Sequence, residues 1–176
     1  AKSVPYFSQI GGTGKLDADW TVYNVNGDEK TWINDATAST YSSITAVKVT
    51  AGAKYVYNTK ADANDWLVSP AIHLEADKEY KVSFYVKTAG SYKESLRLAV
   101  ANANTADAMA SKSETLLDFP ELTEKAFVKK SVVYVARESG DYYFGLYEYS
   151  KKDLYNVFVT AFSVAENITT PAPVTN

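Results

Sequence analysis

Strict alternation of apolar and polar side chains is the feature of this sequence that most constrains its fold. From Tyr80 to Lys87, tyrosine, valine and phenylalanine occupy every second position, and lysine or serine fills most positions between them. The same period of two recurs in residues 95–100, 142–147 and 157–162. Because successive side chains of a β-strand point to opposite faces, the pattern predicts half-buried strands rather than helices.

Less regular segments complete the expected set of elements. Further strands are expected near residues 20–24, 43–50, 55–58 and 129–135, and glycine-containing turns separate many of the segments. Only residues 105–117 have the composition of a helix, with Thr105 or Asp107 as the candidate N-cap. About ten strands with little helix predict an all-β protein, a β-sandwich or a barrel, with at most one short helix.

Composition narrows the classes of function. The 176 residues are most simply one domain, and the net charge of −3 with no basic stripe argues against a nucleic-acid partner. The absence of cysteine excludes disulfides, thiolate zinc sites and cysteine nucleophiles. No apolar run approaches the ~18 residues that span a bilayer, so membrane insertion is not expected.

Catalysis is not expected either. The single histidine, His73, alternates with Ile72 and Leu74 and is therefore expected to face solvent. No spacing typical of a catalytic triad accompanies it. Among 21 acidic residues, no carboxylate pair stands out as a glycosidase pair.

Three ordered motifs carry a resemblance to a known family. Residues 65–72 read Asp-Trp-Leu-Val-Ser-Pro-Ala-Ile; residues 24–28, Asn-Val-Asn-Gly-Asp, precede them together with Trp32, and residues 80–84, Tyr-Lys-Val-Ser-Phe, follow. In this order they resemble the cleaved-adhesin, or choice-of-anchor J, domain of secreted and surface proteins from Bacteroidetes. The resemblance covers most of the chain. It implies a jelly-roll β-sandwich over residues 1–166, of the fold type seen in galactose-binding-like or MAM-like domains. Residues 167–176 are then expected to be a linker or the start of a fibronectin type III-like domain.

The resemblance also implies a structural calcium ion between an N-terminal loop and the last strand. The expected ligands all offer hard oxygens, as calcium requires; they are Asn24, Asn26, Asp28, Asp65, Glu94 and Asn156. The family's loop is usually richer in aspartate, so the asparagines at 24 and 26 reduce the negative charge. The alternative is an Asx-rich turn in which these side chains bond the local backbone.

Tyrosine is the most abundant aromatic residue, with 14 copies, and it suits surfaces that contact sugars. Tyr143, Tyr147 and Tyr149 fall on one face of a predicted strand, and Trp66, Tyr92 and Tyr41 are also expected to be exposed. The alternative is that these rings cover the edges of the sandwich or pack against loops.

Two functions therefore remain open at this stage. The first is a non-catalytic adhesion or carbohydrate-binding module of a secreted or cell-surface, outer-membrane-associated bacterial protein. Its partner would be a glycan or a host or cell-surface protein, and it would act as a monomeric module of a larger chain. The second is a structural spacer or protein-docking domain beside an enzyme or an anchor.

Overall fold

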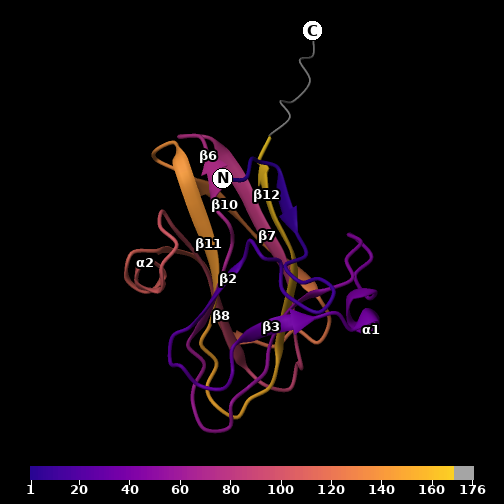
Figure 1. Ribbon diagram of the computed structural model, residues 1–176. Coiled ribbons are helices and arrows are strands. Elements are labelled where there is room, and N and C mark those ends of the chain that lie inside the picture. The colour runs from indigo at the N-terminus through magenta and orange to yellow at the C-terminus, as the bar shows by residue number, and fades with distance from the viewer. Residues whose placement is uncertain (169–176) are drawn as a thin grey trace.

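Two antiparallel sheets packed face to face form the protein (Figure 1). The computed structural model describes residues 1–168, so most of the expected linker at 167–176 lies outside the described residues. The strands are β1 (Tyr6–Ser8), β2 (Thr21–Asn24), β3 (Trp32–Asp35), β4 (Gly52–Tyr55), β5 (Asp65–Val68), β6 (Ile72–Leu74), β7 (Glu79–Thr88), β8 (Glu94–Ala101), β9 (Glu114–Leu122), β10 (Val128–Val135), β11 (Gly140–Glu148) and β12 (Val157–Glu166). The helices are α1 (Ala38–Tyr41) and α2 (Ala106–Ser111).

Each sheet has six strands. The first has the order β10-β7-β12-β4-β3, with β1 added to β12, and the second has the order β2-β5-β11-β8-β9, with β6 added to β11. Ser69 bridges the break between β5 and β6, because its backbone N–H donates to the carbonyl of Phe144 and its hydroxyl accepts from the Phe144 N–H. The predicted β-sandwich is confirmed.

The inner faces of the two sheets form the main core. Val82, Phe84, Leu98, Phe144 and Leu146 are fully buried there, as the alternation predicted. Burying a side chain of this size stabilises the fold by about 1.5–3 kcal/mol. The alternation therefore identified which side chains of β7, β8 and β11 point into the core.

A β-bulge in β12 changes the phase of the alternation. The register with β7 shifts between Thr160 and Ser163, and Ala161 adopts a φ of 53°. Val159 points into the core before the bulge and Phe162 does so after it, whereas Ala161 joins a small cluster outside the main core. The prediction of strict alternation through residue 162 was therefore wrong, because a bulge inserts an extra residue and so exchanges the inward-facing and outward-facing positions.

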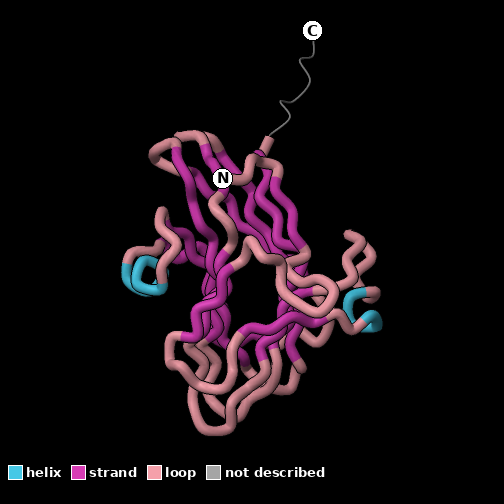
Figure 2. Tube along the Cα trace, viewed as in Figure 1, coloured by secondary structure: helices cyan, strands magenta, loops and turns pink. Residues whose placement is uncertain are grey.

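Two short helices lie on opposite sides of the sandwich (Figure 2), where at most one was expected. Helix α1 and residues 42–50 replace the strand expected at 43–50. Tyr41, expected to be exposed, is fully buried and packs with Ile44, Val49 and Ala161 against the first sheet. The apolar residues of this segment are buried, as their pattern indicated, but residues 42–50 cover a face of the sheet instead of pairing with a strand.

The expected helix at 105–117 is shorter than its composition indicated. Thr105 caps α2, since its hydroxyl accepts from the Ala108 N–H at 3.0 Å. The helix ends at Ser111, and the chain continues as the edge strand β9, which sequence reasoning missed. Pro120 is tolerated within β9 because an edge strand leaves one side unpaired. Neither helix within residues 1–168 is long and apolar enough to cross a membrane.

Candidate functional site

A row of large side chains crosses the outer face of the second sheet. The strand register places Tyr23, Trp66, Tyr147, Arg97 and Asp118 opposite one another on β2, β5, β11, β8 and β9. These positions are out of phase with the core residues of the same strands, so their side chains point outward. Register alone therefore gathers residues from five strands into one line.

The rings in this row stack on one another. The Trp66 and Tyr147 ring centroids lie 4.5 Å apart, and Tyr149 continues the stack 5.6 Å from Tyr147 with an interplanar angle of 15°. The Arg97 guanidinium lies 5.0 Å from the Tyr149 centroid and 5.8 Å from that of Tyr147. Trp66, Tyr147, Tyr149, Arg97 and Asp118 are called the outer platform below.

Hydrogen bonds fix the orientation of the platform. The Tyr147 hydroxyl donates to Asn64 Oδ1 at 2.8 Å, and the Tyr149 hydroxyl donates to Asp118 Oδ1. Arg97 Nε lies 3.6 Å from the same Asp118 oxygen. Burial, together with the Asp118 carboxylate, raises the pKa of Tyr149 to about 12, so the phenol keeps its proton at neutral pH. Tyr147 and Tyr149 are half-buried and reach solvent with their orientation fixed.

The other predicted aromatic residues lie elsewhere or are covered. Trp66 was expected to be exposed, but only 3% of it is accessible, because Tyr147 stacks on it and Met109 of α2 packs beside it. Gly145 creates the space for this packing, since a Cβ there would overlap both Met109 and the Trp66 ring. Tyr143 is half-buried against the same cluster. Tyr92 is 42% exposed on the loop before β8, as expected.

Three carboxylates are buried between the sheets at one end of the sandwich. This end, called the loop end below, is where residues 25–31, 56–64, 89–93 and 149–156 connect the strands, at the bottom of Figure 1. Asp65 begins β5, Glu94 begins β8 and Glu148 ends β11, and none of the three is accessible to solvent. They are called the acidic cluster.

Several buried oxygens around the acidic cluster have no hydrogen-bond partner within residues 1–168. They are Asn24 Oδ1, Thr31 Oγ1, Tyr55 OH, Asp65 Oδ1, Glu94 Oε1, Glu148 Oε2 and Asn156 Oδ1. Most buried polar atoms in folded proteins are hydrogen-bonded, so such a concentration requires an explanation. Asn24 pairs with Asp65 across β2 and β5, and Asp65 pairs with Glu148 across β5 and β11.

Burial dominates the electrostatics of the acidic cluster. It raises the pKa of Glu148 to about 8, with the Glu94 and Asp65 charges adding to the effect. Burial likewise raises the pKa of Asp65 to about 6 and raises that of Glu94. The pKa of the Tyr55 phenol is raised by burial and then by the charges of Asp65, Glu148, Asp28 and Glu94. Charged carboxylates in this position require a proton or a cation.

The donor set fits a hard cation by chemistry. Every unpartnered atom of the cluster is a carboxylate, amide, phenol or hydroxyl oxygen, the ligand type that calcium prefers. No three His, Asp or Glu side chains in the described part of the chain are arranged to share one metal ion. A cation here would therefore depend on the amide and hydroxyl oxygens of Asn24, Asn156 and Thr31 as well as on the carboxylates.

The predicted calcium ligands divide into two groups. Asn24, Asp65, Glu94 and Asn156 each place an unpartnered oxygen at the loop end. Asn26 and Asp28 instead bond between loops: Asn26 Nδ2 donates to the Asp62 carbonyl at 2.9 Å, and Asp28 Oδ2 accepts from Asn58 Nδ2 at 3.0 Å. Asp28 Oδ1 also accepts from the Lys30 N–H at 3.1 Å, a local backbone bond of the kind that the turn alternative describes. Sequence reasoning missed Glu148, Tyr55 and Thr31. One feature of the sequence could have revealed Glu148: it follows Phe144 and Leu146 at every second position, so it is a carboxylate at a position expected to face the core.

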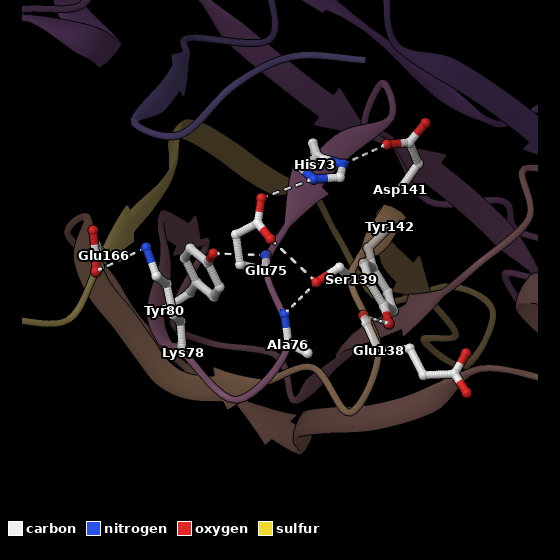
Figure 3. A network of polar contacts seen from close by, with 10 residues as sticks. All are labelled: His73, Glu75, Ala76, Lys78, Tyr80, Glu138, Ser139, Asp141, Tyr142 and Glu166. Atoms are coloured by element: carbon white, nitrogen blue, oxygen red, sulfur yellow. Dashed lines mark hydrogen bonds and ion pairs between the residues drawn. The ribbon is translucent and has the colours of Figure 1, made fainter.

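His73 is exposed at the opposite end of the sandwich, as predicted, and takes part in a polar network (Figure 3). Its Nδ1 lies 3.2 Å from Asp141 Oδ1 and its Nε2 lies 3.1 Å from Glu75 Oε1. Ser139 donates to the other oxygen of Glu75 and accepts from the Ala76 N–H. Both ring nitrogens are thus engaged by carboxylates, so the imidazole is not oriented toward a hydroxyl nucleophile.

Comparison with known proteins identifies the fold. No protein-family model matches the chain, and no curated protein matches its sequence. Among solved structures, the K1 cleaved adhesin domain of Lys-gingipain from Porphyromonas gingivalis W83 matches with a TM-score of 0.71 at 14% identity, covering 93% of this chain and 99% of that one. The chain has the cleaved-adhesin fold. The K3 domain of the same protein matches with a TM-score of 0.66 at 16% identity, covering 91% and 96% of the two chains.

Carbohydrate-binding modules share the same jelly-roll architecture. The structure of TmCBM61 in complex with β-1,4-galactotriose matches with a TM-score of 0.57 at 12% identity, over 85% of this chain and 90% of that one. The CBM22-1 xylan-binding domain from Paenibacillus barcinonensis Xyn10C matches with a TM-score of 0.54 at 16% identity, over 97% and 99%. The resemblance inferred from the ordered motifs is therefore confirmed for the fold.

Proposed function

We propose that this chain is a non-catalytic adhesion or carbohydrate-binding module that contacts its ligand through the outer platform. The observation that carries the proposal is the half-exposed Tyr147–Tyr149 stack, fixed by Arg97, Asp118 and Asn64. An aromatic surface flanked by hydrogen-bonding groups of fixed orientation matches a sugar, which has an apolar ring face and polar hydroxyls. Such a shallow surface gives modest affinity per site, so adhesion would draw on several modules.

The comparisons support this class of function and the proposed location. The matching structures are adhesin domains and carbohydrate-binding modules, one solved with a galactotriose and one described as xylan-binding. Adhesin domains act on the outside of the cell, which favours a secreted or cell-surface protein, associated with the outer membrane. A glycan, or a glycan-bearing surface protein, is the partner that fits the platform.

A structural calcium ion is the second part of the proposal. Two carboxylates, Asp65 and Glu148, which lie opposite each other on β5 and β11, would hold it together with the amide oxygens of Asn24 and Asn156. The ion would supply positive charge to three carboxylates that share a buried space. Its role would be to hold together strand ends from both sheets, and hence the loops that follow them.

A glycan array tests the proposal. The array carries host mucin and plant polysaccharides and is probed with the wild-type chain in millimolar calcium and then in chelator. We expect saturable binding to one class of sugar and its loss in the Tyr147→Ala/Tyr149→Ala variant. Phe7→Ala is the matched control, because Phe7 is an exposed aromatic residue on β1, in the other sheet.

Other outcomes lead to other conclusions. An array profile that survives the Tyr147→Ala/Tyr149→Ala change would overturn the platform as the contact surface. Failure to bind any glycan in either condition would favour a spacer or protein-docking domain. Circular dichroism melting curves of each variant separate loss of binding from loss of folding.

A further inference from the structure

Three tyrosines from three different loops stack at the loop end of the sandwich. The ring centroids of Tyr57 and Tyr155 lie 5.5 Å apart at 26°, and those of Tyr155 and Tyr92 lie 6.0 Å apart at 17°. Tyr155 is 44% exposed and Tyr92 is 42% exposed, among the most exposed large hydrophobic residues of the described chain. These three residues are called the tyrosine terrace.

The rings of the terrace overlap only in part. Their planes are nearly parallel, but the centroid separations exceed the contact distance of about 3.5–4.0 Å between stacked carbon atoms. Each ring is therefore displaced sideways relative to its neighbour. Part of the surface of Tyr155 and of Tyr92 is accessible to solvent.

Hydrogen bonds between the loops hold the terrace in place. Asn58, next to Tyr57, donates from Nδ2 to Asp28 Oδ2 at 3.0 Å and accepts at its carbonyl from the Asp153 N–H at 2.8 Å. The Tyr155 N–H donates to Glu94 Oε2 at 2.8 Å, which ties the middle ring to the buried acidic cluster. A surface that is already ordered loses less conformational freedom on binding.

A polar cavity of about 370 Å³ adjoins the terrace at Tyr57. Glu29, Lys30, Asn58 and Thr59 are among its lining residues, so it offers both donors and acceptors of hydrogen bonds. Aromatic surface beside such groups suits a molecule with apolar C–H faces and many hydroxyls, and a purely apolar peptide side chain would leave the polar groups unpaired.

The charges around the terrace are nearly balanced. The four loops at this end carry five lysines, at 30, 60, 93, 151 and 152, and four acidic residues outside the buried cluster, at 28, 29, 62 and 153. Lys151 pairs with Asp62 at 3.7 Å. A strongly anionic polymer or membrane surface would find no excess of positive charge here, whereas a neutral ligand needs none.

We propose that the tyrosine terrace is a second carbohydrate site, specific for a neutral oligosaccharide chain. Consecutive sugar rings would lie along Tyr155 and Tyr92, and their hydroxyls would reach the polar cavity beside Tyr57. The terrace shares no residue with the outer platform, although Tyr149 and Tyr155 both belong to residues 149–156, so variants of each surface must separate the two sites. Two sites on one module would let it bind a polysaccharide more tightly than either site alone.

The test compares terrace and platform variants on an array of neutral plant and mucin-type oligosaccharides, with sialylated and sulfated members as charge controls. We expect at least one neutral oligosaccharide signal that persists in Tyr147→Ala/Tyr149→Ala and is weakened about tenfold or more in Tyr92→Ala/Tyr155→Ala. The single variant Tyr92→Ala removes the exposed ring at one end of the stack and guards against misfolding of the double variant. Phe7→Ala should retain every signal.

The outcomes separate the two sites. If the terrace variants lose binding and the platform variants keep it, the terrace proposal is supported and the platform proposal fails. If the platform variants lose binding and the terrace variants keep it, the terrace proposal is overturned. Terrace-dependent signals confined to sialylated or sulfated glycans would overturn the neutral-ligand assignment. An array profile of the folded Tyr92→Ala/Tyr155→Ala variant identical to that of the wild type would also overturn it.

Discussion

Asp65 and Glu148 lie directly opposite each other on β5 and β11, and both carboxylates are fully buried. Like charges opposite each other on neighbouring strands are destabilising, and burial increases that cost. Glu94, also buried, begins the strand β8 on the other side of β11. The loop end is therefore stable only when protons or a cation offset these charges, and the free energy of unfolding should respond to either.

Calcium should raise the thermal stability of the protein. At a concentration about 100-fold above the dissociation constant, an ion that binds only the folded state adds about 2.7 kcal/mol. For a domain of this size the gain corresponds to a rise in Tm of roughly 5–10 °C. Calorimetric scans in calcium, in magnesium and in chelator measure it, and equal Tm values in calcium and chelator would refute the calcium site.

The Glu148→Gln variant provides the residue-level check. Glutamine cannot ionise, so above the raised pKa of Glu148 the variant carries one buried negative charge fewer, and at such a pH we expect a higher Tm than wild type in chelator and a smaller rise on adding calcium. Glu121→Gln is the matched control, because the Glu121 side chain is 69% exposed. A calcium response in Glu148→Gln as large as that of the wild type would exclude this carboxylate as a ligand.

Replacing Gly145 by alanine should disrupt the packing beneath the outer platform. An added Cβ would overlap Met109 Cε and the Trp66 ring. Such overpacking costs about 1–3 kcal/mol of unfolding free energy. Denaturant titration measures the loss, and Gly140→Ala is the control, since a Cβ at Gly140 meets no atom within 4 Å.

A double-mutant cycle identifies the partner of Gly145. Met109 is fully buried, so Met109→Ala alone should be destabilising. In the Gly145→Ala background the same truncation relieves the overlap, and the combined loss should be smaller than the sum of the two. Strict additivity would show that Met109 does not limit the space at this position.

The single histidine should titrate above its ordinary pKa. Hydrogen bonds to Asp141 and Glu75 favour the protonated imidazole and raise the pKa of His73 above the usual 6.5. The stabilisation is therefore fully present below the unfolded-state pKa and is lost as the pH rises through the folded-state pKa. Because the chain has one histidine, a proton NMR titration reads it directly. Asp141→Asn should lower the pKa toward 6.5, and an unchanged titration would contradict the pairing.

Sequence periodicity predicted the strands that face the core and missed the segments governed by other contacts. The alternation in β7 and β11 follows from one buried and one outward face, and both strands lie where it placed them. The edge strand β9 has a register shift opposite Leu98 and Ala99 and shows no regular alternation, and its first residues, 114–117, were expected to belong to a helix. Residues 42–50 follow an apolar pattern, but they cover a sheet face instead of pairing.

The sequence by itself determined the sandwich, its inward-facing residues and the family resemblance, because these depend on local periodicity and on the order of motifs along the chain. Only the tertiary structure decided which aromatic residues reach solvent. Trp66 is buried because Gly145 and Met109 make room for it and Tyr147 covers it. Strand register alone brought Glu148 opposite Asp65, and pairing between strands more than 80 residues apart is set by the packing of the whole sheet.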